Sequence, residues 1–141
     1  MIKNVILGEE IVVTTKNKVG LLADIAKTLA NKGINIESVV GYEVGKTARL
    51  MLVTNANLGM VSALRRKKYK SVVETEVIMV DLENKPGALK VVTTALGNGG
   101  IDIKYLYVTA PSGGDSSKMV LQTSDNERAI ALLTKYISAR P

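Results

Sequence analysis

The chain contains the hexapeptide Asn17-Lys18-Val19-Gly20-Leu21-Leu22, and a related hexapeptide, Asn84-Lys85-Pro86-Gly87-Ala88-Leu89, follows at an offset of 67 residues. A second motif returns at the same offset, because Gly33-Ile34-Asn35-Ile36 becomes Gly100-Ile101-Asp102-Ile103. The spacing between the two motifs is therefore the same in both copies, with no insertion or deletion between them. Constant spacing of this kind predicts a tandem duplication, in which the loop, the segment after it and the next strand form one structural unit.

The first copy, residues 8–74, has the pattern of a mixed α and β domain. β-branched residues at 11–15 predict a strand that runs into the loop. After Gly20, apolar residues recur with helical spacing as far as Gly33, which is a typical helix-ending residue. Strands at 34–40, 48–53 and 72–73 and a helix at 58–66 complete the order βαββαβ.

The second copy, residues 75–141, repeats this order but lacks its last strand. Strands at 77–80, 101–107 and 118–123 and a helix at 88–96 match the first copy, and the spacing of Ser124 and Glu127 predicts a capping box before the final helix. The position equivalent to 72–73 falls at or beyond residues 139–140. We hypothesise that the apolar segment 1–7, which has no counterpart in the repeat, fills the vacant edge of the second sheet.

The composition excludes several kinds of site. The 141 residues include neither cysteine nor histidine, so there is no thiol or imidazole for catalysis and no zinc site of the usual kind. We therefore expect no enzyme activity, no metal and no cofactor. The chain has no apolar segment long enough to span a membrane and no evident signal peptide, which favours a soluble protein of the cytoplasm.

The positive charge is uneven. Residues 1–70 contain 12 Lys and Arg against 5 Asp and Glu, whereas residues 71–141 contain 7 against 8. The densest run, 65–70, is typical of the solvated end of a helix, although it also suits an acidic partner or a nucleic acid. Because the chain lacks Phe, Trp and an RNP-type motif, nucleic-acid binding is the less favoured interpretation.

The repeated Asn-Lys-x-Gly loop, the amphipathic helix and the Gly-Ile-[Asn/Asp]-Ile motif together resemble the ACT domain, twice over nearly the whole chain. The resemblance implies two ferredoxin-like βαββαβ domains of the α+β class, packed side by side through their sheets. It also implies the regulatory binding of a small molecule, usually an amino acid, at domain interfaces, and no catalysis by the domain itself.

The physical properties of the loop agree with this resemblance. Glycine allows a ligand to approach the backbone closely, and the first amides of the following helix suit a carboxylate. Asn35 and Asp102, at the start of the next strand, are expected to lie near enough to meet an α-ammonium. The candidate ligand-binding residues are Asn17, Lys18, Val19, Gly20, Leu21, Leu22, Asn35 and Ile36 in the first copy and Asn84, Pro86, Gly87, Ala88, Leu89, Asp102 and Ile103 in the second.

The two sites are not expected to be equivalent, because Pro86 stiffens its loop and Asp102 would repel a carboxylate. The sequence thus favours an amino-acid sensor or regulatory subunit, for an amino-acid biosynthetic enzyme encoded separately, that forms a homodimer. The alternative is a ligand-free dimerisation module that docks an acidic partner through its basic first domain. In a third interpretation, the glycines and asparagines only form a turn and a helix cap and bind no ligand.

Overall fold

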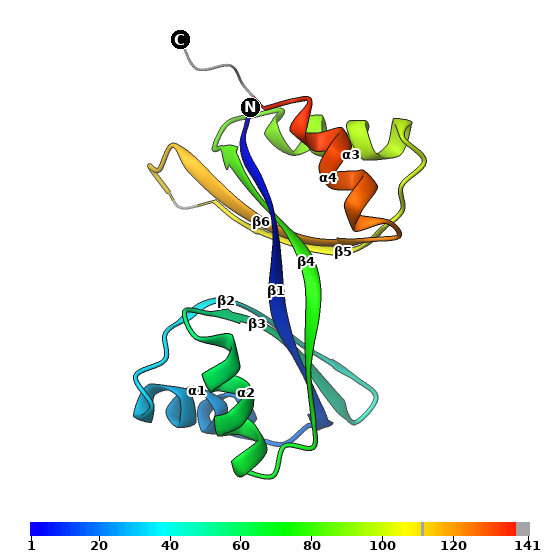
Figure 1. Ribbon diagram of the computed structural model, residues 1–141. Helices are drawn as coiled ribbons and strands as arrows, with labels where there is room; N and C mark the ends of the chain where they lie inside the picture. The colour runs from blue at the N-terminus through cyan, green and yellow to red at the C-terminus, as the bar shows by residue number, and fades with distance from the viewer. Residues whose placement is uncertain (111, 138–141) are drawn as a thin grey trace. The chain divides into compact units, whose positions relative to one another are not determined.

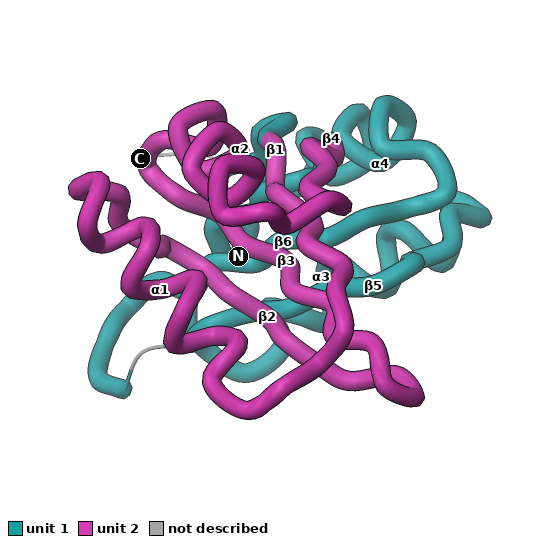
Figure 2. Tube along the Cα trace, turned by 90° about the horizontal axis from the view of Figure 1, so that it is seen from below, with its two compact units in different colours: residues 1–8, 76–141 teal, residues 9–75 magenta. Residues whose placement is uncertain are grey.

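The computed structural model describes residues 1–110 and 112–137, which form two compact units. Unit 1 comprises residues 1–8 and 76–141, and unit 2 comprises residues 9–75 (Figure 2). Two long strands, β1 (Ile2–Lys16) and β4 (Ser71–Glu83), contribute one half to each unit (Figure 1). The proposed end of the second copy, at residues 138–141, lies outside the described residues.

Unit 2 is a four-stranded antiparallel sheet with two helices on one face (Figure 1). Along the chain it contains the second half of β1, α1 (Leu21–Asn31), β2 (Ile36–Val44), β3 (Thr47–Thr54), α2 (Asn57–Arg66) and the first half of β4. The strand order is β2-β3-β1-β4, so the first strand of the copy lies inside the sheet. The core between sheet and helices contains Ile11, Val13, Leu50, Leu52, Ile25, Leu29, Met60 and Leu64, all at most 5% exposed.

Unit 1 repeats this arrangement with α3 (Ala88–Asn98), β5 (Ile103–Thr109), β6 (Ser116–Thr123) and α4 (Asn126–Thr134). Its strand order is β1-β4-β6-β5, and the first half of β1 lies at the edge beside β4. This half is part of the unit's core, because Ile2 is completely buried among Leu82, Leu96 and Leu133. In unit 2 the equivalent edge is formed by the first half of β4. Each unit is thus an α+β, ferredoxin-like βαββαβ-type fold, as the sequence predicts.

The repeat extends to individual hydrogen bonds. Asn57 at the start of α2 accepts bonds from both the backbone N–H and the hydroxyl of Thr54, each at 3.0 Å. Asn126 at the start of α4 accepts the same two bonds from Thr123, at 3.0 and 2.8 Å. These asparagine side chains satisfy backbone groups at the strand-to-helix turn. The two copies therefore share the same hydrogen-bonding pattern at this turn.

Two details of the sequence interpretation are wrong. The strands expected at 72–73 and 77–80 are one continuous strand, β4, because no turn-forming residue interrupts the segment between them. The final helix is capped by Asp125, whose carboxylate accepts the Arg128 amide at 3.1 Å, and not by Ser124. The Ser124 hydroxyl instead accepts the Asp102 amide at 3.0 Å, which connects the turn after β6 to the residue before β5. No helix in the described part of the chain is long and apolar enough to cross a membrane.

Candidate functional site

The loop of the first copy turns sharply into α1. Gly20 precedes the helix with φ of 84°, a left-handed conformation that strongly favours glycine. The Leu21 amide donates to the Lys18 carbonyl at 3.2 Å, and the first helical bond runs from the Asp24 amide to the Gly20 carbonyl at 2.9 Å. The amides of residues 22 and 23 therefore come before the first helical bond, at the positive end of the helix dipole.

A cleft of about 470 Å³, open to solvent, lies beside this loop. Its lining comes from the loop, from the start of α1 and from the facing hairpin of β2 and β3: Asn17, Lys18, Gly20, Leu21, Leu22, Ala23, Gly41, Tyr42, Glu43, Ala48 and Leu50. The volume is within the range of small-molecule sites. The lining combines a cation and a helix N-terminus, one carboxylate, and apolar side chains.

The carboxylate in this cleft belongs to Glu43, a residue that the sequence interpretation missed. The Asn17 side-chain amide donates to the Glu43 carboxylate at 2.5 Å, and the Asn17 backbone amide donates to the Lys46 carbonyl at 2.8 Å. Asn17 thus ties the loop to the β2–β3 hairpin. Glu43 belongs to no motif, and only strand pairing brings it to the loop.

The structure brings the loop residues of the first copy together beside the cleft, but their side chains differ from one another in exposure. Leu21 is buried in the core at 4% exposure, Leu22 is 45% exposed at the cleft, and Val19 points fully into solvent. A methyl group added to Gly20 would meet no atom within 4 Å, so the space next to the loop backbone is empty. A ligand could therefore reach the backbone here without displacing a side chain.

The loop of the second copy has the same backbone but a different neighbour. Gly87 has φ of 90°, the Ala88 amide donates to the Lys85 carbonyl at 3.2 Å, and Ala88 and Leu89 match the exposure of Leu21 and Leu22. However, the Met1 side chain lies against Gly87, with its Cε 3.6 Å from the position that a Cβ would occupy.

Charges around the second loop are paired. The Glu83 amide donates to the Met1 carbonyl at 2.8 Å, and the Glu83 carboxylate is bound by the Lys85 ammonium at 2.8 Å and by the terminal ammonium at 3.5 Å. These cations, Lys85 first, hold the pKa of Glu83 below its usual value. The Asn84 side-chain amide donates to the Gly114 carbonyl at 3.0 Å, a backbone acceptor, whereas Asn17 in the first copy donates to the Glu43 carboxylate.

The expected proximity of Asn35 and Asp102 to the glycine loops is wrong. Asn17 lies beside the start of β3, whereas the Asn35 amide is bound by the Asn55 side chain at 3.0 Å, beyond the end of β3. The eight-residue strand between them corresponds to about 23 Å. Ile36 starts β2 at the same remote end, and Asp102 and Ile103 lie likewise beside Ser124, across the length of β6. Within one unit, these residues cannot meet a ligand held by the loop.

A polar cluster supports the first turn of α1. The Tyr69 hydroxyl donates to the Asp24 carboxylate at 2.5 Å, and the Lys67 ammonium lies 3.7 Å from the same carboxylate. The hydrogen bond from Tyr69, with help from Lys67 and Lys18, keeps the pKa of Asp24 below its usual value. Burial of the ring, together with the carboxylate, raises the pKa of Tyr69 to about 12. Across the described residues, no group of His, Asp and Glu is arranged to hold a metal ion.

Comparison with known proteins supports the resemblance for part of the chain. Residues 10–67 match the family model of the ACT domain. Among curated proteins, none matches the sequence. The fold is similar to that of a protein from Bacteroides thetaiotaomicron, with a TM-score of 0.86 and 23% identity over 94% of this chain and 90% of that one.

The fold is also similar to that of the regulatory subunit of aspartate kinase from Thermus thermophilus in its ligand-free form, with a TM-score of 0.65 and 14% identity over 97% and 99% of the two chains. The corresponding subunit from Thermus flavus gives a TM-score of 0.62 and 13% identity over the same shares. At such identities these likenesses show the fold alone.

Proposed function

We propose that this protein is a non-catalytic amino-acid sensor, built from two ACT-type domains at 8–74 and 75–141, the second completed by residues 1–7. The observation that carries the proposal is the open cleft beside the Asn17–Gly20 loop, within the segment that matches the ACT domain. The similarity to regulatory subunits of aspartate kinase supports a regulatory role.

The cleft has a complement for each part of an amino acid. The start of α1 and Lys18 suit the α-carboxylate, because unpaired amides and a cation both favour negative charge. The Glu43 carboxylate suits the α-ammonium, and Leu22 and Leu50 offer apolar contact to the side chain. We therefore favour a neutral amino acid with an apolar side chain.

The energetics require a second surface over the ligand. A helix N-terminus contributes about 0.3–1 kcal/mol to binding an anion, whereas a micromolar site needs about 8 kcal/mol. Burying a side chain the size of leucine adds about 1.5–3 kcal/mol, but only if the cleft is covered. We propose that an ACT-type domain of a second copy, in a homodimer, closes the cleft, and that closure is the signal passed to a separate target enzyme in the cytoplasm.

The first test is a thermal-shift screen of the chain against the twenty amino acids, followed by calorimetry. We expect stabilisation by one ligand or a few related ones, since stability rises with RT ln(1 + [L]/Kd). Glu43→Gln should weaken binding about tenfold by removing the ammonium partner while keeping an acceptor for Asn17.

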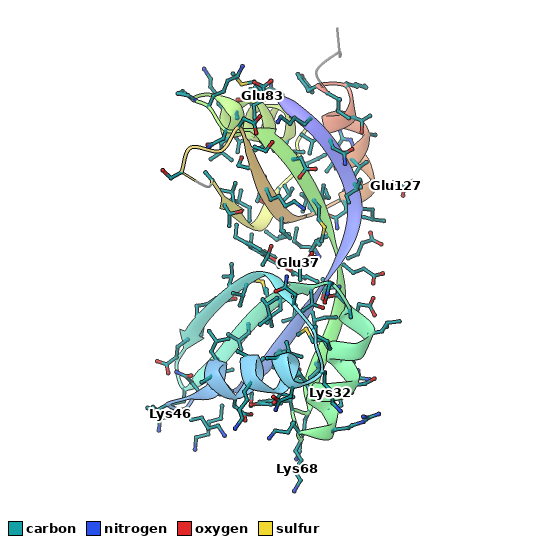
Figure 3. All side chains as sticks on the ribbon, turned by 90° about the vertical axis from the view of Figure 1, so that its left-hand side faces the viewer. Lys32, Glu37, Lys46, Lys68, Glu83 and Glu127 are labelled. Carbon is teal, nitrogen blue, oxygen red and sulfur yellow. The ribbon has the colours of Figure 1, made fainter. Side chains whose placement is uncertain are left out.

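The matched control is Glu37→Gln, an exposed carboxylate near the start of β2 (Figure 3), which should bind as well as the unmodified chain. No stabilisation by any amino acid at millimolar concentration would reject the sensor and favour the alternative, a ligand-free module that docks an acidic partner.

A further inference from the structure

A second cleft of unit 2, of about 460 Å³, is unusually rich in positive charge. Four lysines line it: Lys16 and Lys18 from the end of β1 and the loop, and Lys67 and Lys68 from the end of α2. Figure 3 shows Lys68 just past the end of α2. These lysines come from two segments about fifty residues apart in the sequence, and the fold brings them together.

The one carboxylate that lines this cleft is already engaged. Asp24 accepts the Tyr69 hydroxyl and pairs with Lys67. Lys16, Lys18 and Lys68 form no ion pair with any carboxylate of the described residues. The cleft therefore has a surplus of three positive charges, which repel one another and which an anion would neutralise.

Lys68 has a backbone conformation that is unusual for a lysine. Its φ is 70°, and in the described part of the chain no other residue except glycine has a positive φ. Helices commonly end on glycine or asparagine in this conformation, because a Cβ is strained there. Lys68 thus combines a strained backbone conformation with an ammonium group in a cationic cleft. Backbone strain of this kind is often found at functional sites.

The duplication supplies an internal control. At the repeat offset, Lys16 is replaced by Glu83 and Asp24 by Val91, and Glu83 neutralises Lys85 at 2.8 Å. The cationic cleft is therefore absent from the second copy at these positions. It is a property of unit 2 and not a requirement of the fold.

We propose that this cleft binds the phosphate groups of a small molecule, a phosphate ester or a diphosphate. Lysine ammonium groups are suited to phosphate, and the volume is that of a small-molecule site. The ring of Tyr69 is only 8% exposed, so it offers no platform on which a nucleic-acid base could stack. A neighbouring cleft shares Lys67 and adds Lys32 and Arg66, which strengthen the local positive field.

The experiment is calorimetric titration of the full chain with pyrophosphate at low ionic strength. Lys68→Gln should weaken binding about tenfold, because it removes one charged hydrogen-bond donor. Lys46→Gln is the control, since Lys46 lies at the β2–β3 turn outside the cleft (Figure 3) and the variant loses the same charge. It should change the Kd by less than about twofold.

Lys68→Gly separates binding from folding. Glycine accepts φ of 70° without strain, so this variant should keep or raise the melting temperature while it loses pyrophosphate affinity as Lys68→Gln does. Asp24→Asn should tighten binding about threefold, because the cleft loses its negative charge while an acceptor for Tyr69 remains.

Three results would overturn the proposal. If pyrophosphate does not bind, or if Lys46→Gln weakens it as much as Lys68→Gln, the cleft is not a phosphate site. If polyglutamate or single-stranded RNA binds with dependence on Lys68 while pyrophosphate does not, the surface docks a macromolecule. All of these titrations are made without amino acid, so their outcome does not depend on the sensor proposal.

Discussion

The two glycine loops have nearly the same backbone and different surroundings. Gly20 and Gly87 have φ of 84° and 90°, and both helices start with the same pattern of bonds. The first loop lies beside an open cleft with Glu43 opposite, whereas the Met1 side chain lies against Gly87 in the second loop, and Glu83 pairs there with Lys85 and the terminal ammonium. A duplicated motif therefore preserves a turn, while the neighbouring segments decide whether that turn remains open to a ligand.

The largest effect is expected where β1 enters the core of unit 1. Ile2→Ala should destabilise the chain by about 3 kcal/mol through the cavity that it leaves, and lower the melting temperature by about 10 °C. Ile6→Ala, on the same strand but 47% exposed, is the control and should have little effect in calorimetric melting. Small and equal losses of stability in the two variants would show that the packing of β1 in the core of unit 1 does not hold Met1 against the second loop.

The glycines give the most direct test of the comparison. Gly20→Ala and Gly87→Ala should each destabilise the chain by about 1–2 kcal/mol, because alanine is strained at positive φ. Only Gly20→Ala should also weaken amino-acid binding, by about tenfold, because its methyl group enters the open space beside the loop. Calorimetry on both variants measures this difference. Loss of binding in Gly87→Ala alone would place the ligand at the second loop.

The contribution of the Tyr69–Asp24 hydrogen bond to stability should depend on pH. Tyr69→Phe should lower the free energy of unfolding by about 1 kcal/mol, because it removes the hydrogen bond to Asp24. In the second copy the residue equivalent to Asp24 is Val91, which cannot accept such a bond. The pKa of Tyr69 is raised from 10.0 to about 12, so its contribution is complete below pH 10 and is lost as pH rises to about 12.

The pKa of Asp24 is lowered, so its contribution is present above its usual pKa of 3.8 and is lost as pH falls below it. Denaturant unfolding should be measured at both ends of the pH scale. Because the Tyr69 contribution is lost above pH 10, the free energy of unfolding should fall more steeply there in the unmodified chain than in Tyr69→Phe. Identical slopes for the two proteins would contradict the assignment of this pH dependence to Tyr69.

The smallest effect comes from exchanging a residue between the loops. Val19 and Pro86 occupy equivalent positions in loops of the same geometry, and Val19 is fully exposed. Val19→Pro should stabilise the chain by about 0.4–1 kcal/mol by restricting the unfolded state, and Pro86→Val should destabilise it by a similar amount. Thermal melting of both variants measures this, and destabilisation by Val19→Pro would show that the two backbones differ.

The fold was predictable because both of its signals are local. Helical spacing after Gly20 and Gly87 predicts α1 and α3, and the β-branched runs predict the strands, although not that β4 is continuous. The site was predictable only in part. The loop and the start of α1 line the cleft as expected, but Glu43 was missed and Asn35 was placed at the wrong end of the sheet, since both depend on strand register.

The sequence by itself determined the repeated motifs, the βαββαβ order and the two glycine turns, because periodicity and positive-φ glycines act over a few residues. Only the tertiary structure decided that Glu43 faces the first loop, that Met1 lies against the second, and that Lys16 and Lys68 share one cleft. Such contacts join residues far apart in the chain, and they arise from strand pairing and helix packing that no local pattern specifies.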